Sequence, residues 1–156
     1  MIKNLLERIN LVEGVKGLNE DAIRQVEMHL NVNLPNDFKE ISQVVNYEYL
    51  GGMAFFNFES EDTYSVMRET LAYRKNASLP HRYLVLAEDD ASVIFLETKN
   101  DPNQETPVIW CAIEDAYNIC EEKPLEYDHK IFPSFKNFFE YLLNEEIKRQ
   151  KLPLEE

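Results

Sequence analysis

Three short apolar runs in the middle of the chain constrain the fold more than any other feature. They are Tyr83–Ala87, Ser92–Leu96 and Pro107–Ala112, and they are rich in the β-branched and aromatic residues that favour strands. Only Glu88–Ala91 separates the first two runs, which predicts a β-hairpin with a four-residue acidic turn. Because sequential elements usually lie beside each other, the three strands are expected to form an antiparallel meander.

Helical patterns flank these strands on both sides. Ile2–Val12 has apolar residues at helical spacing, Asn19 is a predicted N-cap, and Leu34-Pro35 introduces a third helix. Ser134 is expected to cap a terminal helix with a wide apolar face. At 156 residues, the chain is predicted to form a single α+β domain over 1–156, with an antiparallel sheet packed against N-terminal and C-terminal helices.

The segments between these elements give weaker signals. Gly51-Gly52 permits backbone angles that a β-carbon disfavours, and the aromatic run Met53–Phe58 that follows is a predicted strand. Asp62 is expected to cap a helix that continues to about Asn76. Residues 113–131 are predicted to be acidic and irregular, with one short strand.

Charge is concentrated in one quarter of the chain. The net charge is −13, and residues 88–128 contain twelve acids against only Lys99 and Lys123. A field of this sign disfavours direct binding to nucleic acid or to anionic membranes, and it attracts a basic protein. The simpler interpretation is that acidic loops keep the protein soluble.

No pattern of catalytic or metal-ligating residues is recognisable. The three histidines share no metal-binding spacing, and glycine-rich phosphate-binding and nucleophile motifs are absent. Cys111 is predicted to be a buried small hydrophobe, and Glu121 beside Cys120 should raise the pKa of that thiol. We therefore expect no enzyme activity, no cofactor and no metal site. An acidic pair such as Glu88 and Asp90 is interpreted as turn chemistry and not as a cation site.

The sequence also predicts a cytoplasmic location. It has no run of about 18 apolar residues that would span a membrane, and charged residues interrupt the first residues where a signal peptide would be continuously apolar. Two cysteines do not provide the disulfide framework of a small secreted domain.

Several short motifs together resemble those of the SUKH superfamily, which includes bacterial immunity proteins and the yeast regulator of cell-wall assembly. In chain order they are Glu27 on a helix, the L-P-x-D-F turn at Leu34–Phe38, Gly51-Gly52, the strand–turn–strand at Tyr83–Leu96, and the S-F-x-x-F-F-x-x-L helix at Ser134–Leu142. The similarity extends over about residues 19–147. One departure is that family members often have a glycine in the mid-chain turn, where this chain has Glu88–Ser92.

The resemblance implies a non-enzymatic binding protein with no catalytic residues to transfer. Bacterial members are typically encoded beside polymorphic toxins and bind the cognate toxin domain, here expected to be a basic nuclease that is neutralised by stoichiometric occlusion. The predicted contacts are the acidic loops and two tyrosines: Glu59, Glu61, Asp62, Glu88, Asp89, Asp90, Asp101, Glu105, Tyr47 and Tyr49. The alternative is an intracellular scaffold or regulator without a toxin, and a more distant one is a small-molecule or metal-dependent enzyme. The sequence leaves the oligomeric state open.

Overall fold

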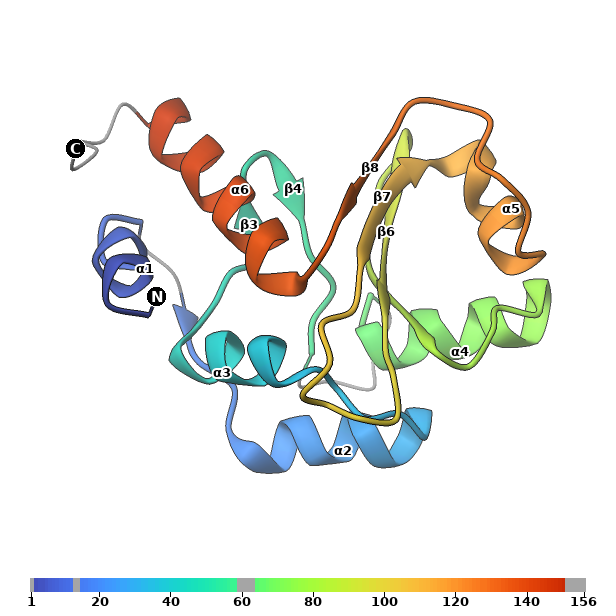
Figure 1. Cartoon of the computed structure of the whole chain (residues 1–156), viewed down its shortest axis with the longest axis horizontal. Helices are drawn as coiled ribbons and strands as arrows, with labels where there is room; N and C mark the ends of the chain where they lie inside the picture. Colours follow the sequence, from blue (N-terminus) through green and yellow to red (C-terminus); the bar gives the residue numbers. More distant parts are fainter. Residues whose placement is uncertain (1, 13–14, 59–63, 151–156) are drawn as a thin grey trace.

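A four-stranded antiparallel sheet forms the centre of the molecule (Figure 1). The computed structural model describes residues 2–12, 15–58 and 64–150. The strands β5 (Tyr83–Glu88), β6 (Ser92–Glu97), β7 (Val108–Ala112) and β8 (His129–Phe132) pair in the order β5-β6-β7-β8. The predicted hairpin, third strand and meander are therefore confirmed, and β8 is the short strand expected within 113–131.

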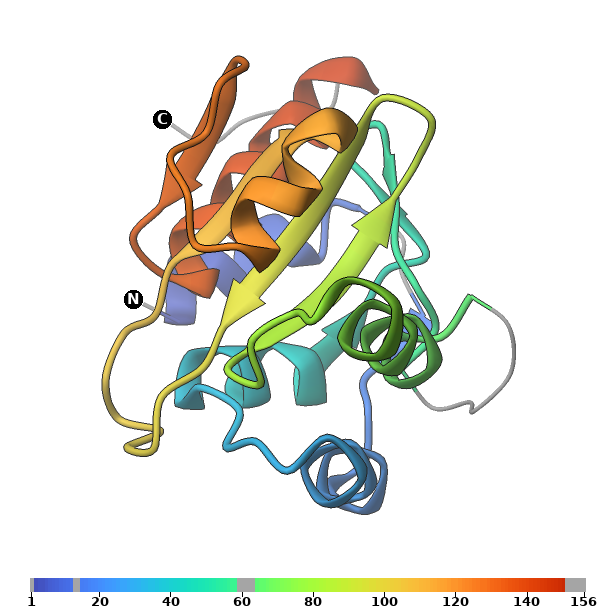
Figure 2. The ribbon, with the colours of Figure 1, turned by 90° about the vertical axis from the view of Figure 1, so that its right-hand side faces the viewer.

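Helices cover the sheet on both faces, which explains why β5, β6 and β7 are largely continuous apolar runs without polar alternation. On one face Leu84, Ile94 and Leu96 join a core with α3 (Asn36–Val44) and α6 (Phe135–Arg149). On the other face Val85, Val93 and Phe95 pack against α4 (Val66–Ala77) and α5 (Ala116–Cys120). Figure 2 shows α4 and α5 on the side of the sheet that faces the viewer.

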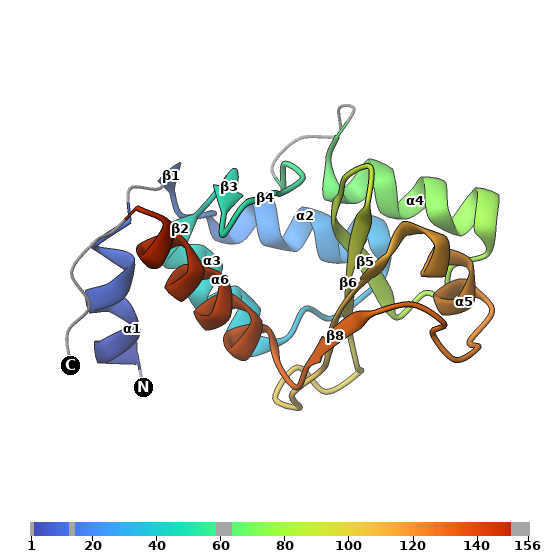
Figure 3. The same ribbon diagram turned by 90° about the horizontal axis from the view of Figure 1, so that it is seen from above.

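Two of the predicted helix caps, Asn19 and Ser134, are confirmed. The Asn19 side chain accepts a hydrogen bond from the Ala22 N–H at 2.8 Å at the start of α2 (Glu20–Leu30), and Ser134 accepts one from the Asn137 N–H at 3.2 Å at the start of α6. Such caps satisfy N–H groups that have no partner within the helix. α1 (Ile2–Ile9) lies beside α6 (Figure 3), where Arg8 pairs with Glu140 at 3.1 Å.

Two predictions about residues 53–77 are corrected by the structure. The expected strand Met53–Phe58 is only the two-residue β4 (Met53–Ala54), which pairs with β3 (Tyr49–Leu50) across Gly51-Gly52. After β4 the aromatic side chains of Phe55, Phe56 and Phe58 pack into the core. The Phe56 N–H bonds to Leu86 O on the edge of β5. The helix α4 begins at Val66 because Ser65, and not Asp62, caps it by accepting the Arg68 N–H at 3.0 Å.

Two further differences concern short elements. The segment expected to be irregular contains a 3₁₀ turn, η1 (Ile113–Asp115), that continues into α5. A second small pairing joins β1 (Val15–Lys16) to β2 (Val45–Asn46) at the end of α3. Asp62 itself lies outside the described residues.

Candidate partner-binding surface

The predicted acidic contacts do not form one surface. Glu88 ends β5 and Asp89 and Asp90 lie in the turn between β5 and β6, whereas Asp101 and Glu105 lie in the loop between β6 and β7. The six residues of β6 separate these connections by about 20 Å, and Figure 2 shows them at opposite ends of the sheet. The third group, Glu59, Glu61 and Asp62, lies outside the described residues.

The three acids of the β5–β6 turn have different roles. Asp89 holds the turn together, since its carboxylate accepts the N–H groups of Ala91 at 2.8 Å and Ser92 at 2.7 Å. Partial burial would raise the pKa of Asp89, but these hydrogen bonds outweigh that effect and lower it. Glu88 accepts a hydrogen bond from the Tyr73 hydroxyl. Asp90 is exposed and has no partner among the described residues, so it is the turn carboxylate available for contact.

A second acidic segment reaches the same end of the sheet. The Ile113 N–H donates to Ala91 O at 3.0 Å, which brings η1 against the turn. Pairing of Cys111 with His129 places the start of β8 at that end as well. We define the acidic end by the side chains of these three segments: Glu88, Asp89, Asp90, Glu114, Glu126 and Asp128. Residues 88–92, 112–116 and 125–129 contain no lysine or arginine, and Lys123, just before the third segment, interacts electrostatically with Glu126.

Asp115 fixes the segment that contains Glu126 and Asp128, although its own side chain is buried and does not reach the protein surface. Its side chain is fully buried and accepts the N–H groups of Glu126 at 2.9 Å and Tyr127 at 3.0 Å, and the Asn118 amide at 2.8 Å. Burial would raise the pKa of Asp115, but these hydrogen bonds and the nearby His129 hold it below its usual range. No sequence pattern predicts this role, because Asp115 has no distinctive spacing to the residues that it binds.

The two predicted aromatic anchors differ in exposure. Tyr47 is only 7% exposed, and its hydroxyl donates towards Val12 O at 3.2 Å. Burial, reinforced by Glu146, raises the pKa of Tyr47 to about 12. This corrects the proposal that Tyr47 is a surface anchor, because its ring belongs to the core. Tyr49 is 70% exposed on β3, on the opposite side of the sheet from α5 (Figure 1).

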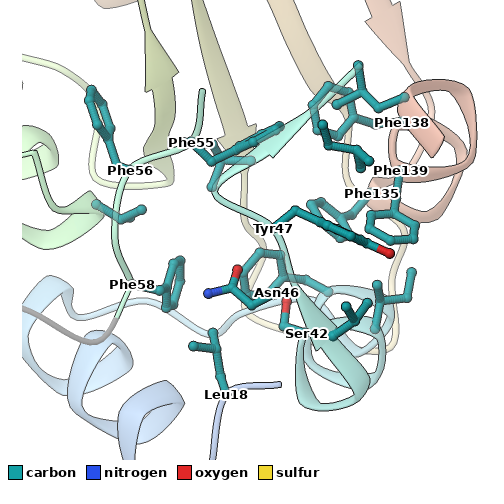
Figure 4. Close-up of a pocket in the computed structure, with 17 residues that line it drawn as sticks. Leu18, Ser42, Asn46, Tyr47, Phe55, Phe56, Phe58, Phe135, Phe138 and Phe139 are labelled. Atoms are coloured by element: carbon teal, nitrogen blue, oxygen red, sulfur yellow. The ribbon is translucent and has the colours of Figure 1, made fainter. Parts of the chain in front are cut away.

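An apolar cavity of about 60 Å³ lies inside the core between α3, α6 and residues 55–58 (Figure 4). Phe55, Phe56 and Phe58 line one part of it, and phenylalanines of α6 line another. Among the described residues that line it, none contributes a carboxylate, imidazole, amine, guanidinium or thiol. The cavity has room for about two water molecules, so we interpret it as a packing feature and not as a reaction site.

Neither cysteine is placed for nucleophilic chemistry. Both are buried and free. Burial, with smaller contributions from Asp115 and Cys120, raises the pKa of Cys111 to about 12, and burial followed by Glu121 raises that of Cys120. The predicted direction for Cys120 is therefore confirmed, although burial is the larger cause. Among the described residues, no three histidine, cysteine or acidic side chains come together as a metal-binding group.

A protein-family model described as SMI1-KNR4 cell-wall, SUKH_5, matches residues 1–144. The chain belongs to the SUKH superfamily. The SUKH match runs from α1 into α6 and includes the whole central sheet. SUKH is generally a non-catalytic family of immunity and scaffold proteins. No curated protein matches the chain, and none of the helices described for this SUKH protein has both the length and the apolar character needed to cross a bilayer.

Proposed function

We propose that this SUKH protein is a bacterial immunity protein that binds a basic toxin domain, a nuclease, and blocks it by stoichiometric occlusion in the cytoplasm. The observation that carries the proposal is the acidic end. There, three segments that contain no lysine or arginine, residues 88–92, 112–116 and 125–129, bring their carboxylates to one end of the sheet. Family membership supports a binding role without catalysis.

Electrostatics explains how such a surface would act. An enzyme that cleaves nucleic acid needs a cationic surface to hold the phosphate backbone. A fixed set of carboxylates is attracted to that surface, accelerates encounter by a factor of about 10 to 1,000 at low ionic strength, and covers the site that the substrate needs. The hydrogen bonds from the Glu126 and Tyr127 N–H groups to the Asp115 carboxylate support this role, because they fix residues 125–129 before the partner binds.

A second candidate function is an intracellular, non-catalytic scaffold or regulator without a toxin partner. The observation in its favour is the description of the matching family model, which refers to the cell wall. The two candidates differ in genetic context, because an immunity gene is expected immediately beside a large toxin gene.

The direct test is co-expression with the C-terminal domain encoded by the neighbouring open reading frame, followed by co-purification and measurement of association rates. The triple variant Asp90→Lys/Glu114→Lys/Asp128→Lys should associate about tenfold more slowly than wild type at low salt. These three side chains are exposed and lack partners among the described residues.

The matched control is Glu7→Lys/Glu40→Lys/Glu48→Lys, which changes the net charge equally at exposed positions on other elements. If both triple variants slow association by the same factor, overall charge and not the acidic end drives binding. If no toxin domain co-purifies with the wild-type protein, the immunity proposal fails.

A further inference from the structure

A surface groove of about 400 Å³ lies between α4 and α5, directly beside the acidic end. Its size falls in the range of about 300–1,000 Å³ that is usual for ligand pockets. Glu69 from α4 and Glu88 from β5 contribute carboxylates, and Tyr117 from α5 contributes an aromatic ring. Figure 3 shows α4 and α5 on the same side of the sheet, and residues of both helices line the groove.

The two carboxylates of the groove, those of Glu69 and Glu88, differ in how they are held. Glu88 is oriented by the hydroxyl of Tyr73, and the Tyr73 ring is itself fixed edge-on against Phe95 with centroids 5.8 Å apart. Glu69 is half-buried, and its carboxylate has no hydrogen bond or ion pair to any other described residue. The groove therefore has one carboxylate, that of Glu88, that a hydrogen bond orients, and one, that of Glu69, that has no partner among the described residues.

The remaining walls suit a side chain with an apolar stem. Ile113 and Ala116 provide apolar surface within the groove, and Tyr117 is 66% exposed, so one side of its ring is free for contact. A guanidinium group stacks on aromatic rings and makes directional hydrogen bonds with carboxylates, while its three methylenes pack on apolar atoms. Lysine has the charge and the stem, but it lacks the planar group.

We propose that this groove binds an arginine side chain of the basic partner protein, with Glu69 and Glu88 contacting the guanidinium group and Tyr117 stacking on it. This inference rests on the proposed function, since it names the anchor through which a cationic partner would dock at the acidic end. Charge complementarity supports this occupant, because the described residues that line the groove include two carboxylates and no lysine, arginine or histidine.

The test uses N-acetyl-L-arginine amide as the probe, titrated into the ¹⁵N-labelled full chain and followed by NMR. We expect saturable shifts confined to the groove, with weaker binding of the lysine analogue and none of the uncharged norleucine analogue. Glu69→Gln should weaken arginine binding about fivefold, and Tyr117→Ala should weaken it by a similar factor. Both positions lie at the surface, so both variants should fold.

Glu48→Gln is the matched control, because it removes one exposed carboxylate on another element. The proposal is overturned if shifts do not saturate, if norleucine amide causes the same shifts, or if Glu69→Gln and Glu48→Gln behave alike. A toxin domain that binds wild type, Glu69→Gln and Tyr117→Ala equally would refute the groove and leave the immunity proposal intact. If the protein binds the arginine probe but captures no toxin domain, the immunity proposal is refuted and arginine binding in the groove stands.

Discussion

Replacing Gly51 by alanine should destabilise the protein by about 3 kcal/mol, whereas the same change at Gly52 should cost about 1 kcal/mol. Both glycines form the two-residue turn between β3 and β4, with φ of +61° at Gly51 and +83° at Gly52. An alanine at either position must adopt a left-handed conformation, which costs about 1–2 kcal/mol and is partly offset by a stiffer unfolded chain.

The difference between the two positions comes from α6. A β-carbon at Gly51 would lie 2.8 Å from Leu142 Cδ2 and 3.0 Å from Leu142 O, whereas at Gly52 it would meet no atom within 4 Å. Leu142 is fully buried, so relief of the clash requires movement of the turn or of α6, and such overpacking typically costs about 1–3 kcal/mol. The Gly51 N–H also donates to the buried Glu146 carboxylate at 3.0 Å, and a shifted turn would strain that bond.

Urea unfolding followed by the fluorescence of Trp110, the one tryptophan in the sequence, measures both variants on the same scale. We expect the midpoint for Gly51→Ala to fall well below that for Gly52→Ala, with similar slopes. Equal losses of stability, or a larger loss at Gly52, would show that close packing of the turn on α6 does not matter.

Three further predictions follow from buried groups. Asp115→Asn should be less stable than wild type by about 2 kcal/mol at pH 7, in urea unfolding. Because the pKa of Asp115 is lowered in the folded state, its contribution is present above the unfolded pKa and is lost as the solution is acidified, so this difference should shrink from about pH 4 downward. Cys111 and Cys120 should react with a thiol reagent at pH 8 only after unfolding, and rapid labelling of the native protein would contradict their burial. Tyr47→Phe should lose about 1 kcal/mol of stability, because the hydroxyl that donates towards Val12 O is removed, without changing partner affinity.

Sequence reasoning succeeded where the structural signal is local. Asn19 and Ser134 act as caps through N–H groups three residues away, and the β5–β6 hairpin is closed by neighbouring residues. These features depend on a few consecutive residues and on apolar period, both of which are visible in one chain.

It was incomplete where a residue's role depends on a distant partner. The sequence predicts Tyr47 as a surface anchor, but its hydroxyl donates towards Val12 O and its ring lies 6.0 Å from the Phe139 ring of α6. Asp115 binds N–H groups eleven and twelve residues away, a separation with no sequence pattern. The acidic loops looked equivalent in sequence, but the length of β6 puts Asp90 and Asp101 at opposite ends of the sheet.

The hydrogen bonds that Asp115 accepts from main-chain N–H groups have an evolutionary consequence. The Asp115 carboxylate accepts hydrogen bonds from the main-chain N–H groups of Glu126 and Tyr127, whose side chains are exposed. Because any residue except proline supplies the same amide, the outward-facing residues can be exchanged while the loop keeps its path. Under the proposed immunity function, substitutions at these positions would change which toxin the protein binds and would leave the fold unchanged.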